Sequence, residues 1–107
     1  MATDRELLEL AAKAAGIALW PGDHWRDTGL SHWLLLKDGR TVWNSLTQDG
    51  DALRLAVALH MALTFTVHGD AHAEGRRDEY AFEESPDAAA NARRAITRCA
   101  AEIERAK

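Results

Sequence analysis

The sequence is poor in residues on which several classes of protein depend. Among 107 residues there are one cysteine and two prolines. The single cysteine, Cys99, has no partner for a disulfide within the chain, and a metal site made only of cysteines is excluded for the same reason. No apolar run reaches the roughly 18 residues that a membrane-spanning helix needs, and the charged run 3–6 stands where a secretory signal would have basic and apolar regions. We therefore expect a cytoplasmic protein that makes no contact with a membrane.

Positive charge and catalytic motifs are scarce as well. Lysine and arginine together number 13 against 17 aspartates and glutamates, so the net charge is −4. This balance argues against a nucleic-acid partner bound mainly by charge. The chain has no Gly-x-Ser-x-Gly elbow and no glycine-rich phosphate loop. Cys99 falls within the apolar stripe of a predicted helix, away from any helix N-terminus that could lower its pKa. We expect no enzymatic activity and no cofactor.

The composition that remains is typical of one globular domain. Hydrophobic residues make up 47% of the chain and charged residues 28%. A chain of this length forms a single hydrophobic core, so the predicted domain spans residues 1–107.

Three helices are predicted from caps and from apolar spacing. Thr3 and Glu6 have the spacing of a capping box, and Gly16 supplies the left-handed residue that ends many helices, which predicts a helix over 4–15. A second helix over 52–61 is apolar on nearly every side and is predicted to be deeply packed. A third is predicted to begin at Pro86, with Ser85 as its N-cap.

The predicted strands are short. The run 17–20 precedes Pro21-Gly22 and favours a strand, whereas the polar stretch 22–31 favours a loop. Runs 32–36 and 41–43 flank Asp38-Gly39, which favours a type I′ hairpin turn with Leu35 opposite Val42.

Two further strands are predicted near the last helix. Residues 63–67 alternate between apolar and polar types, which predicts a half-buried strand with Phe65 and Val67 on its buried face. Residues 68–78 are predicted to form a loop before a last strand at 80–82. The expected fold is α+β, in the order αβββαββα, with three helices packed on one face of a mostly antiparallel sheet of four or five strands.

Tryptophan is the residue in surplus. All four tryptophans fall between residues 20 and 43. Two of them could belong to the core, but one small core cannot readily hide four indoles carried by a polar loop and by both faces of a hairpin. Because tryptophan is enriched at binding hot spots, Trp25, Trp33 and Trp43 are predicted contact residues for a protein partner.

Charged side chains add two weaker candidates. Arg94 and Arg98 share one face of the last predicted helix and could touch an acidic protein surface. The stretch 70–87 is acidic and could mimic nucleic-acid phosphates. In both cases an ordinary solvated surface is the alternative that we favour.

Two imidazoles and two carboxylates lie close together in the segment 68–74. Residue types such as His68, Asp70 and His72 bind zinc and other divalent metals. This predicts, as the alternative function, a small metal-dependent hydrolase or nuclease. The cluster falls in a predicted loop, however, whereas catalytic zinc ligands usually come from rigid elements, so we expect no metal here.

Three segments carry a resemblance to a known group of proteins. They read TDRELLELAAKAAG (3–16), WNSLTQDGDALRLAV (43–57) and ARRAI (92–96). Together they resemble small phage and prophage proteins of bacteria whose function is unknown. In that group proline stands in place of Ser45 and an acidic residue in place of Gln48. The resemblance implies a bacterial or phage origin and implies no catalytic residue.

These observations combine into one functional hypothesis. We expect a non-enzymatic, phage-type accessory protein that binds a host macromolecule, most simply a host protein, with a second copy of the chain as another partner to consider. One version is an inhibitor of a bacterial defence system, in which the stretch 70–87 would enter a nucleic-acid channel.

Overall fold

The computed structural model describes residues 2–29 and 31–107, which form three helices and six short strands. The helices are α1 (Asp4–Ala14), α2 (Asp49–Ala58) and α3 (Ala88–Arg105). The strands are β1 (Trp25–Thr28), β2 (Ser31–Leu35), β3 (Val42–Trp43), β4 (Ala62–Phe65), β5 (Ala71–Glu74) and β6 (Tyr80–Glu83). The α+β class is confirmed. No helix of the described ranges is both long and apolar enough to cross a membrane.

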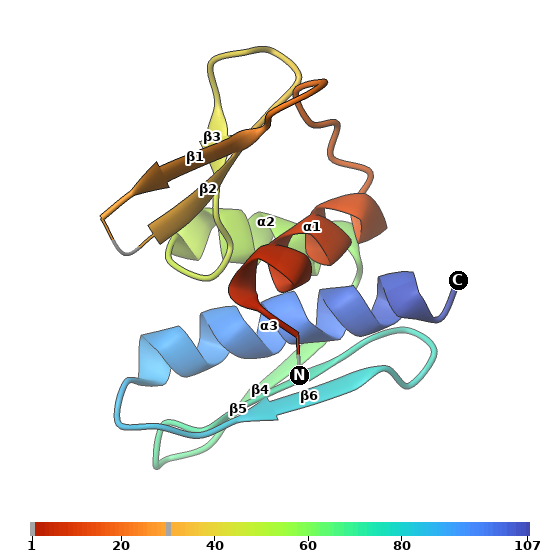
Figure 1. The fold of residues 1–107 in the computed structure, drawn as a ribbon. Helices are drawn as coiled ribbons and strands as arrows, with labels where there is room; N and C mark the ends of the chain where they lie inside the picture. Colours follow the sequence, from red (N-terminus) through yellow and green to blue (C-terminus); the bar gives the residue numbers. More distant parts are fainter. Residues whose placement is uncertain (1, 30) are drawn as a thin grey trace.

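The strands form two sheets instead of the single sheet that we expected. One sheet has the order β1-β2-β3 and the other β4-β5-β6, and all pairings are antiparallel. Helices α1 and α2 lie under the first sheet, and α3 lies between them and the second sheet (Figure 1). The element order is therefore αβββαβββα, and the prediction of helices on one face of one sheet is wrong.

Helix α3 is the layer shared by the two halves. It contacts α1 and α2 on one side and β5 and β6 on the other. Its buried residues consequently reach beyond one stripe, and they are Asn91, Ala95, Ile96, Thr97, Cys99, Ala100 and Ala101. Most of these side chains are small, so elements can approach the helix closely from both sides.

The N-terminal helix follows its sequence signals closely. The Thr3 hydroxyl accepts a hydrogen bond from the Glu6 N–H at 3.2 Å, as a capping box requires. At the other end, Gly16 has a φ of +70°, a left-handed conformation that favours glycine. The helix predicted over 4–15 is confirmed to within one residue.

The first hairpin has the predicted register but a different turn. Leu35 lies opposite Val42, as expected. A type I′ turn needs a positive φ at both central residues, but of Asp38 and Gly39 only Gly39 has one. The Asp38 carboxylate instead accepts hydrogen bonds from the N–H groups of Arg40 and Thr41 and from the Thr41 hydroxyl. These bonds lower the pKa of Asp38 to about 2, and the bond from the Thr41 hydroxyl contributes most.

Two predictions around this hairpin are wrong. The strand expected at 17–20 is reduced to one bridge between Leu19 and Leu36. The loop expected over 22–31 contains β1, which pairs with β2; position 30 of that loop lies outside the described residues. Strand β1 is an edge strand whose residues after Trp25 are polar and exposed, so it shows no apolar alternation.

The second sheet contains a strand where the sequence favoured a loop. Strand β5 lies within 68–78 and pairs with both β4 and β6. Its inward residues, Ala71 and Ala73, are buried but small, which conceals the alternation of a half-buried strand. Helix α3 begins at Ala88 with Asp87 as its N-cap, two residues later than predicted from Ser85 and Pro86.

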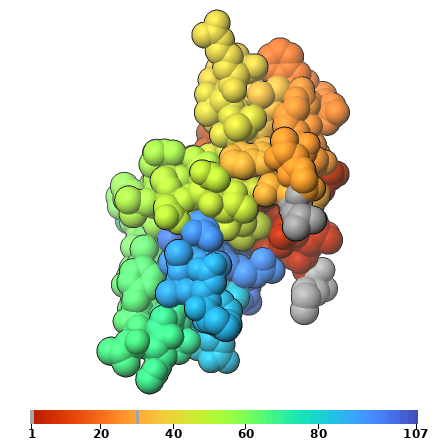
Figure 2. All heavy atoms as spheres, turned by 90° about the vertical axis from the view of Figure 1, so that its left-hand side faces the viewer, coloured from red at the N-terminus to blue at the C-terminus, as the bar shows by residue number. Residues whose placement is uncertain are grey.

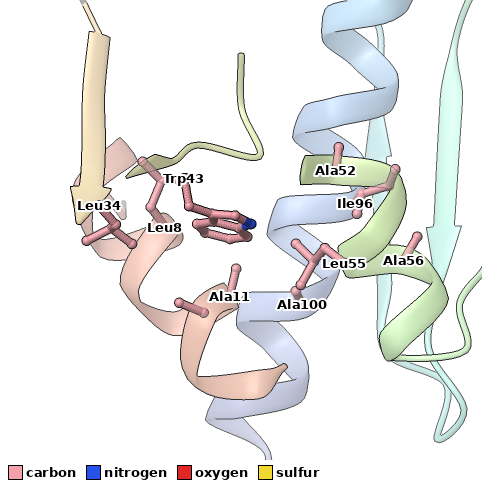
Figure 3. Close-up of a cluster of buried hydrophobic side chains, with 10 residues drawn as sticks. Leu8, Ala11, Leu34, Trp43, Ala52, Leu55, Ala56, Ile96 and Ala100 are labelled. Atoms are coloured by element: carbon pink, nitrogen blue, oxygen red, sulfur yellow. The ribbon is translucent and has the colours of Figure 1, made fainter. Parts of the chain in front are cut away.

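The main core lies between the first sheet and the helices α1, α2 and α3. Figure 3 shows the Trp43 indole pointing between Leu8 of α1 and Leu55 of α2, with Leu34 of β2 and Ile96 of α3 nearby. A second, alanine-rich cluster joins α3 to the second sheet. Trp43 is therefore the one tryptophan buried in the core, and the half-buried Trp25 packs against the edge of that core.

Candidate functional site

The predicted tryptophan contacts divide into one buried and two half-buried side chains. Trp43 is only 5% exposed, so it belongs to the core and is not available to a partner, contrary to our prediction. The Trp25 indole N–H donates to Glu9 at 3.0 Å, and the Arg5 guanidinium lies 4.9 Å from its ring centre. The Trp33 indole N–H donates to the Thr28 hydroxyl at 3.1 Å. Both half-buried indoles thus have polar partners within the chain.

The most exposed tryptophan is one that was not among the predicted contacts. Trp20 is 39% exposed. It lies against the hairpin turn, where a Cβ added to Gly39 would come within 3.0 Å of its ring. The expectation that at least one indole remains exposed is confirmed, but by a ring that covers a turn.

Arg94 and Arg98 join α3 to neighbouring elements. Both pair with Glu83 of β6; Arg94 also lies 3.1 Å from Asp4 of α1, and Arg98 donates to the backbone carbonyl of Phe82. They line a cleft of about 730 Å³ whose arginines, Arg77, Arg94, Arg98 and Arg105, are matched by Asp78, Glu79, Glu83 and Glu102. Because the cleft has no excess of either charge, it does not select an ion of one sign.

The acidic stretch 70–87 is partly committed to the fold. Glu83 pairs with two arginines, the Glu79 carboxylate accepts the backbone N–H of Arg77, and the Asp87 carboxylate caps α3 by accepting the Ala90 N–H. These carboxylates are not free to imitate a row of phosphates.

The histidine cluster is dispersed by β5. His72 lies on the outer face of the sheet, where its Nδ1 is 2.7 Å from the Tyr80 hydroxyl and its ring centre is 4.7 Å from that of Phe82. His68 lies outside the strand and is exposed. Across residues 2–29 and 31–107, no group of three or more histidine, cysteine, aspartate or glutamate side chains is arranged to hold a metal ion.

Cys99 is buried against the second sheet. Burial raises the pKa of its thiol to about 11, and the nearby Glu79 carboxylate acts in the same direction. A thiol that stays protonated at neutral pH is a poor nucleophile.

The least expected feature is an apolar surface on α2 and β4. We define the α2–β4 surface by four side chains whose exposed fractions are large: Leu53 (59%), Val57 (67%), Phe65 (59%) and Val67 (97%). Leu53 and Phe65 border a groove of about 300 Å³ that also reaches Ala92 and Ile96 of α3. Figure 2 shows the face on which α2 (yellow-green), the segment after β4 (green) and the first turns of α3 (blue) meet.

This surface explains why two burial predictions are wrong. Helix α2 was expected to be deeply packed, and its Ala52, Leu55 and Ala56 are indeed buried. Leu53 and Val57 lie on the opposite face, which no part of the described chain covers. Phe65 and Val67, expected on a buried strand face, lie at the open edge of the second sheet and beyond its end. The apolar character of 52–61 on nearly every side was the sequence signal for a second, exposed apolar face.

Charged groups of both signs border the groove. Asp49 pairs with Arg93 at 2.7 Å, and the Arg93 Nε donates to the carbonyl of Leu46 at 2.9 Å. Two residues further along α2 and outside the groove lining, Asp51 pairs with Arg54 at 2.8 Å. Of these groups, the Asp49 carboxylate and the Arg54 guanidinium are mostly exposed and can meet charges of a partner.

Comparison with known proteins adds no relative: no family model, curated protein or solved structure matches the chain. The resemblance to small phage and prophage proteins therefore stays a prediction.

Proposed function

We propose that the chain is a non-enzymatic protein-binding domain and that its contact site is the α2–β4 surface. The observation that carries this proposal is the exposure of Leu53 and Phe65, which line an apolar groove, together with that of Val57 one turn further along α2 and Val67 just beyond β4. Contiguous exposed apolar surface with a polar rim is characteristic of protein–protein interfaces.

The position of these side chains within α2 supports a binding role over a packing role. Leu53 and Leu55 are the same residue type on one short helix, yet Leu53 is 59% exposed and Leu55 is 1% exposed. The fold of the domain needs only the Leu55 face. A second apolar face on a 10-residue helix lowers solubility unless a partner covers it.

The first sheet is the weaker contact site. Its half-buried indoles have hydrogen-bond partners inside the chain, and Trp20 packs on its own hairpin turn. No described feature favours the alternative of a metal-dependent hydrolase or nuclease. The His72 imidazole bonds the Tyr80 hydroxyl, and in the described part of the chain no three potential metal ligands are arranged to hold an ion.

Site-specific photo-crosslinking in cells of the native host tests the proposal. A photoreactive residue at Val57 should form a discrete adduct with a protein, and adding Leu53→Ser should abolish that adduct. The same reactive residue at Lys13, which is exposed at the end of α1, is the matched control and should form none. Equal adducts at both positions, or none at Val57, would refute the assignment of the surface.

A further inference from the structure

Strand β4 is an open sheet edge that lacks the usual protection. It contains Ala62, Leu63, Thr64 and Phe65, and it pairs only with β5. Natural edge strands are commonly protected by charge, proline, a bulge or short length, because unpaired backbone groups recruit other strands. Strand β4 has no charged residue and no proline.

The other three edges are protected. Strand β1 contains Arg26, whose guanidinium donates to the carbonyls of Asp23 and Trp25. Strand β3 has only two residues. On β6, Arg98 donates to the outward carbonyl of Phe82. The contrast singles out β4 as the edge that is left to accept a strand.

The direction of the free backbone groups follows from the hairpin that joins β4 and β5. The Thr66 N–H bonds the Asp70 carbonyl at 3.0 Å. Because an antiparallel ladder alternates between bonded and non-bonded pairs, Thr64 also bonds toward β5, whereas Leu63 and Phe65 direct their N–H and C=O groups to the open edge.

We propose that β4 pairs antiparallel with β4 of a second copy of this chain, which joins the two second sheets into one sheet of six strands. This inference rests on the proposed function, because it names the partner of the α2–β4 surface. A two-fold axis at Thr64 places Leu63 of one copy opposite Phe65 of the other. These are the residues whose backbone groups are free to bond.

Side chains and charges fit a self-complementary contact. Leu63 and Phe65 share the sheet face that carries the buried Ala71 and Ala73, so those of a second copy would lie beside the groove and the exposed side of α2. Helix α2 carries an exposed carboxylate on Asp49, which lines the groove, and an exposed guanidinium on Arg54, which lies on α2 outside the groove lining. A surface that carries both signs of charge can neutralise itself across a two-fold axis. A partner that carries only one sign of charge would instead repel one of these two groups.

Sedimentation velocity of the purified chain over a range of concentrations provides the first test. The wild-type chain should show a reversible monomer–dimer equilibrium. Thr64→Lys places two like charges opposite each other at the axis and should weaken the dimer about tenfold or more. Val42→Lys, on the exposed edge strand β3 of the other sheet, is the matched control and should leave the dimer unchanged. Circular dichroism checks that each variant is folded.

Amide hydrogen exchange supplies a readout specific to strand pairing. The N–H groups of Leu63 and Phe65 should become protected as the concentration rises, whereas that of Thr64 should be protected at every concentration. A dimer without this protection, or one that Thr64→Lys leaves intact, overturns the pairing.

The crosslinking experiment separates failure of this inference from failure of the proposed function. An adduct between two copies through Val57, with a dimer in solution, supports both. A monomeric chain whose Val57 captures a different protein overturns the pairing and leaves the binding function standing. A monomeric chain with no adduct overturns both.

Discussion

Replacing either of two leucines on α2 should separate folding from binding. Leu55 is 1% exposed and lies in the main core, so Leu55→Ala should cost about 2–5 kcal/mol of unfolding free energy and lower the Tm by about 10 °C or more. Leu53 is 59% exposed, so Leu53→Ala removes little buried surface and should cost less than about 1 kcal/mol. The two changes remove the same atoms from one helix, so helix propensity cancels in the comparison.

For association the order should reverse: Leu53→Ala should weaken the dimer more than Leu55→Ala does. If the exposed part of Leu53 is covered in both copies of a dimer, its loss removes roughly 2–3 kcal/mol, which raises the dissociation constant roughly 30- to 150-fold. Urea unfolding should be followed at concentrations where the chain is monomeric, because dimerisation adds to apparent stability. Sedimentation velocity then gives the association constant. Equal losses of monomer stability for the two variants would refute the assignment of Leu53 to a contact surface.

Three other predictions follow from burial and hydrogen bonding. Cys99, whose thiol pKa is raised to about 11, should react with a thiol reagent at pH 8 only as fast as the chain opens; rapid labelling of folded protein would contradict its burial. Thr97→Val leaves the buried Ser45 hydroxyl without its 2.7 Å partner and should cost about 1–3 kcal/mol in urea unfolding, a cost that adding Ser45→Ala should partly relieve. Acrylamide should quench the fluorescence of Trp20 and spare that of Trp43, so Trp20→Phe should lower the quenchable fraction and Trp43→Phe should raise it.

The sequence by itself determined the local features that short-range interactions control. The capping box at Thr3 and the end of α1 at Gly16 depend on residues within one turn of the chain, so they could be predicted. The register of the first hairpin was also predictable, because a short loop leaves few ways to pair the flanking strands. The turn type was not, because the Asp38 side chain offers the backbone a competing set of hydrogen bonds.

Only the tertiary structure decided which apolar residues are covered. The spacing within α2 and β4 marks Leu53, Val57 and Phe65 as apolar but does not say how many layers lie against them. The division of the strands into two sheets places α3 between both halves and leaves one face of α2 and one edge of β4 without a neighbour. Coverage is a long-range property of how layers stack, and for that reason the candidate site moved from the tryptophan hairpin to the α2–β4 surface.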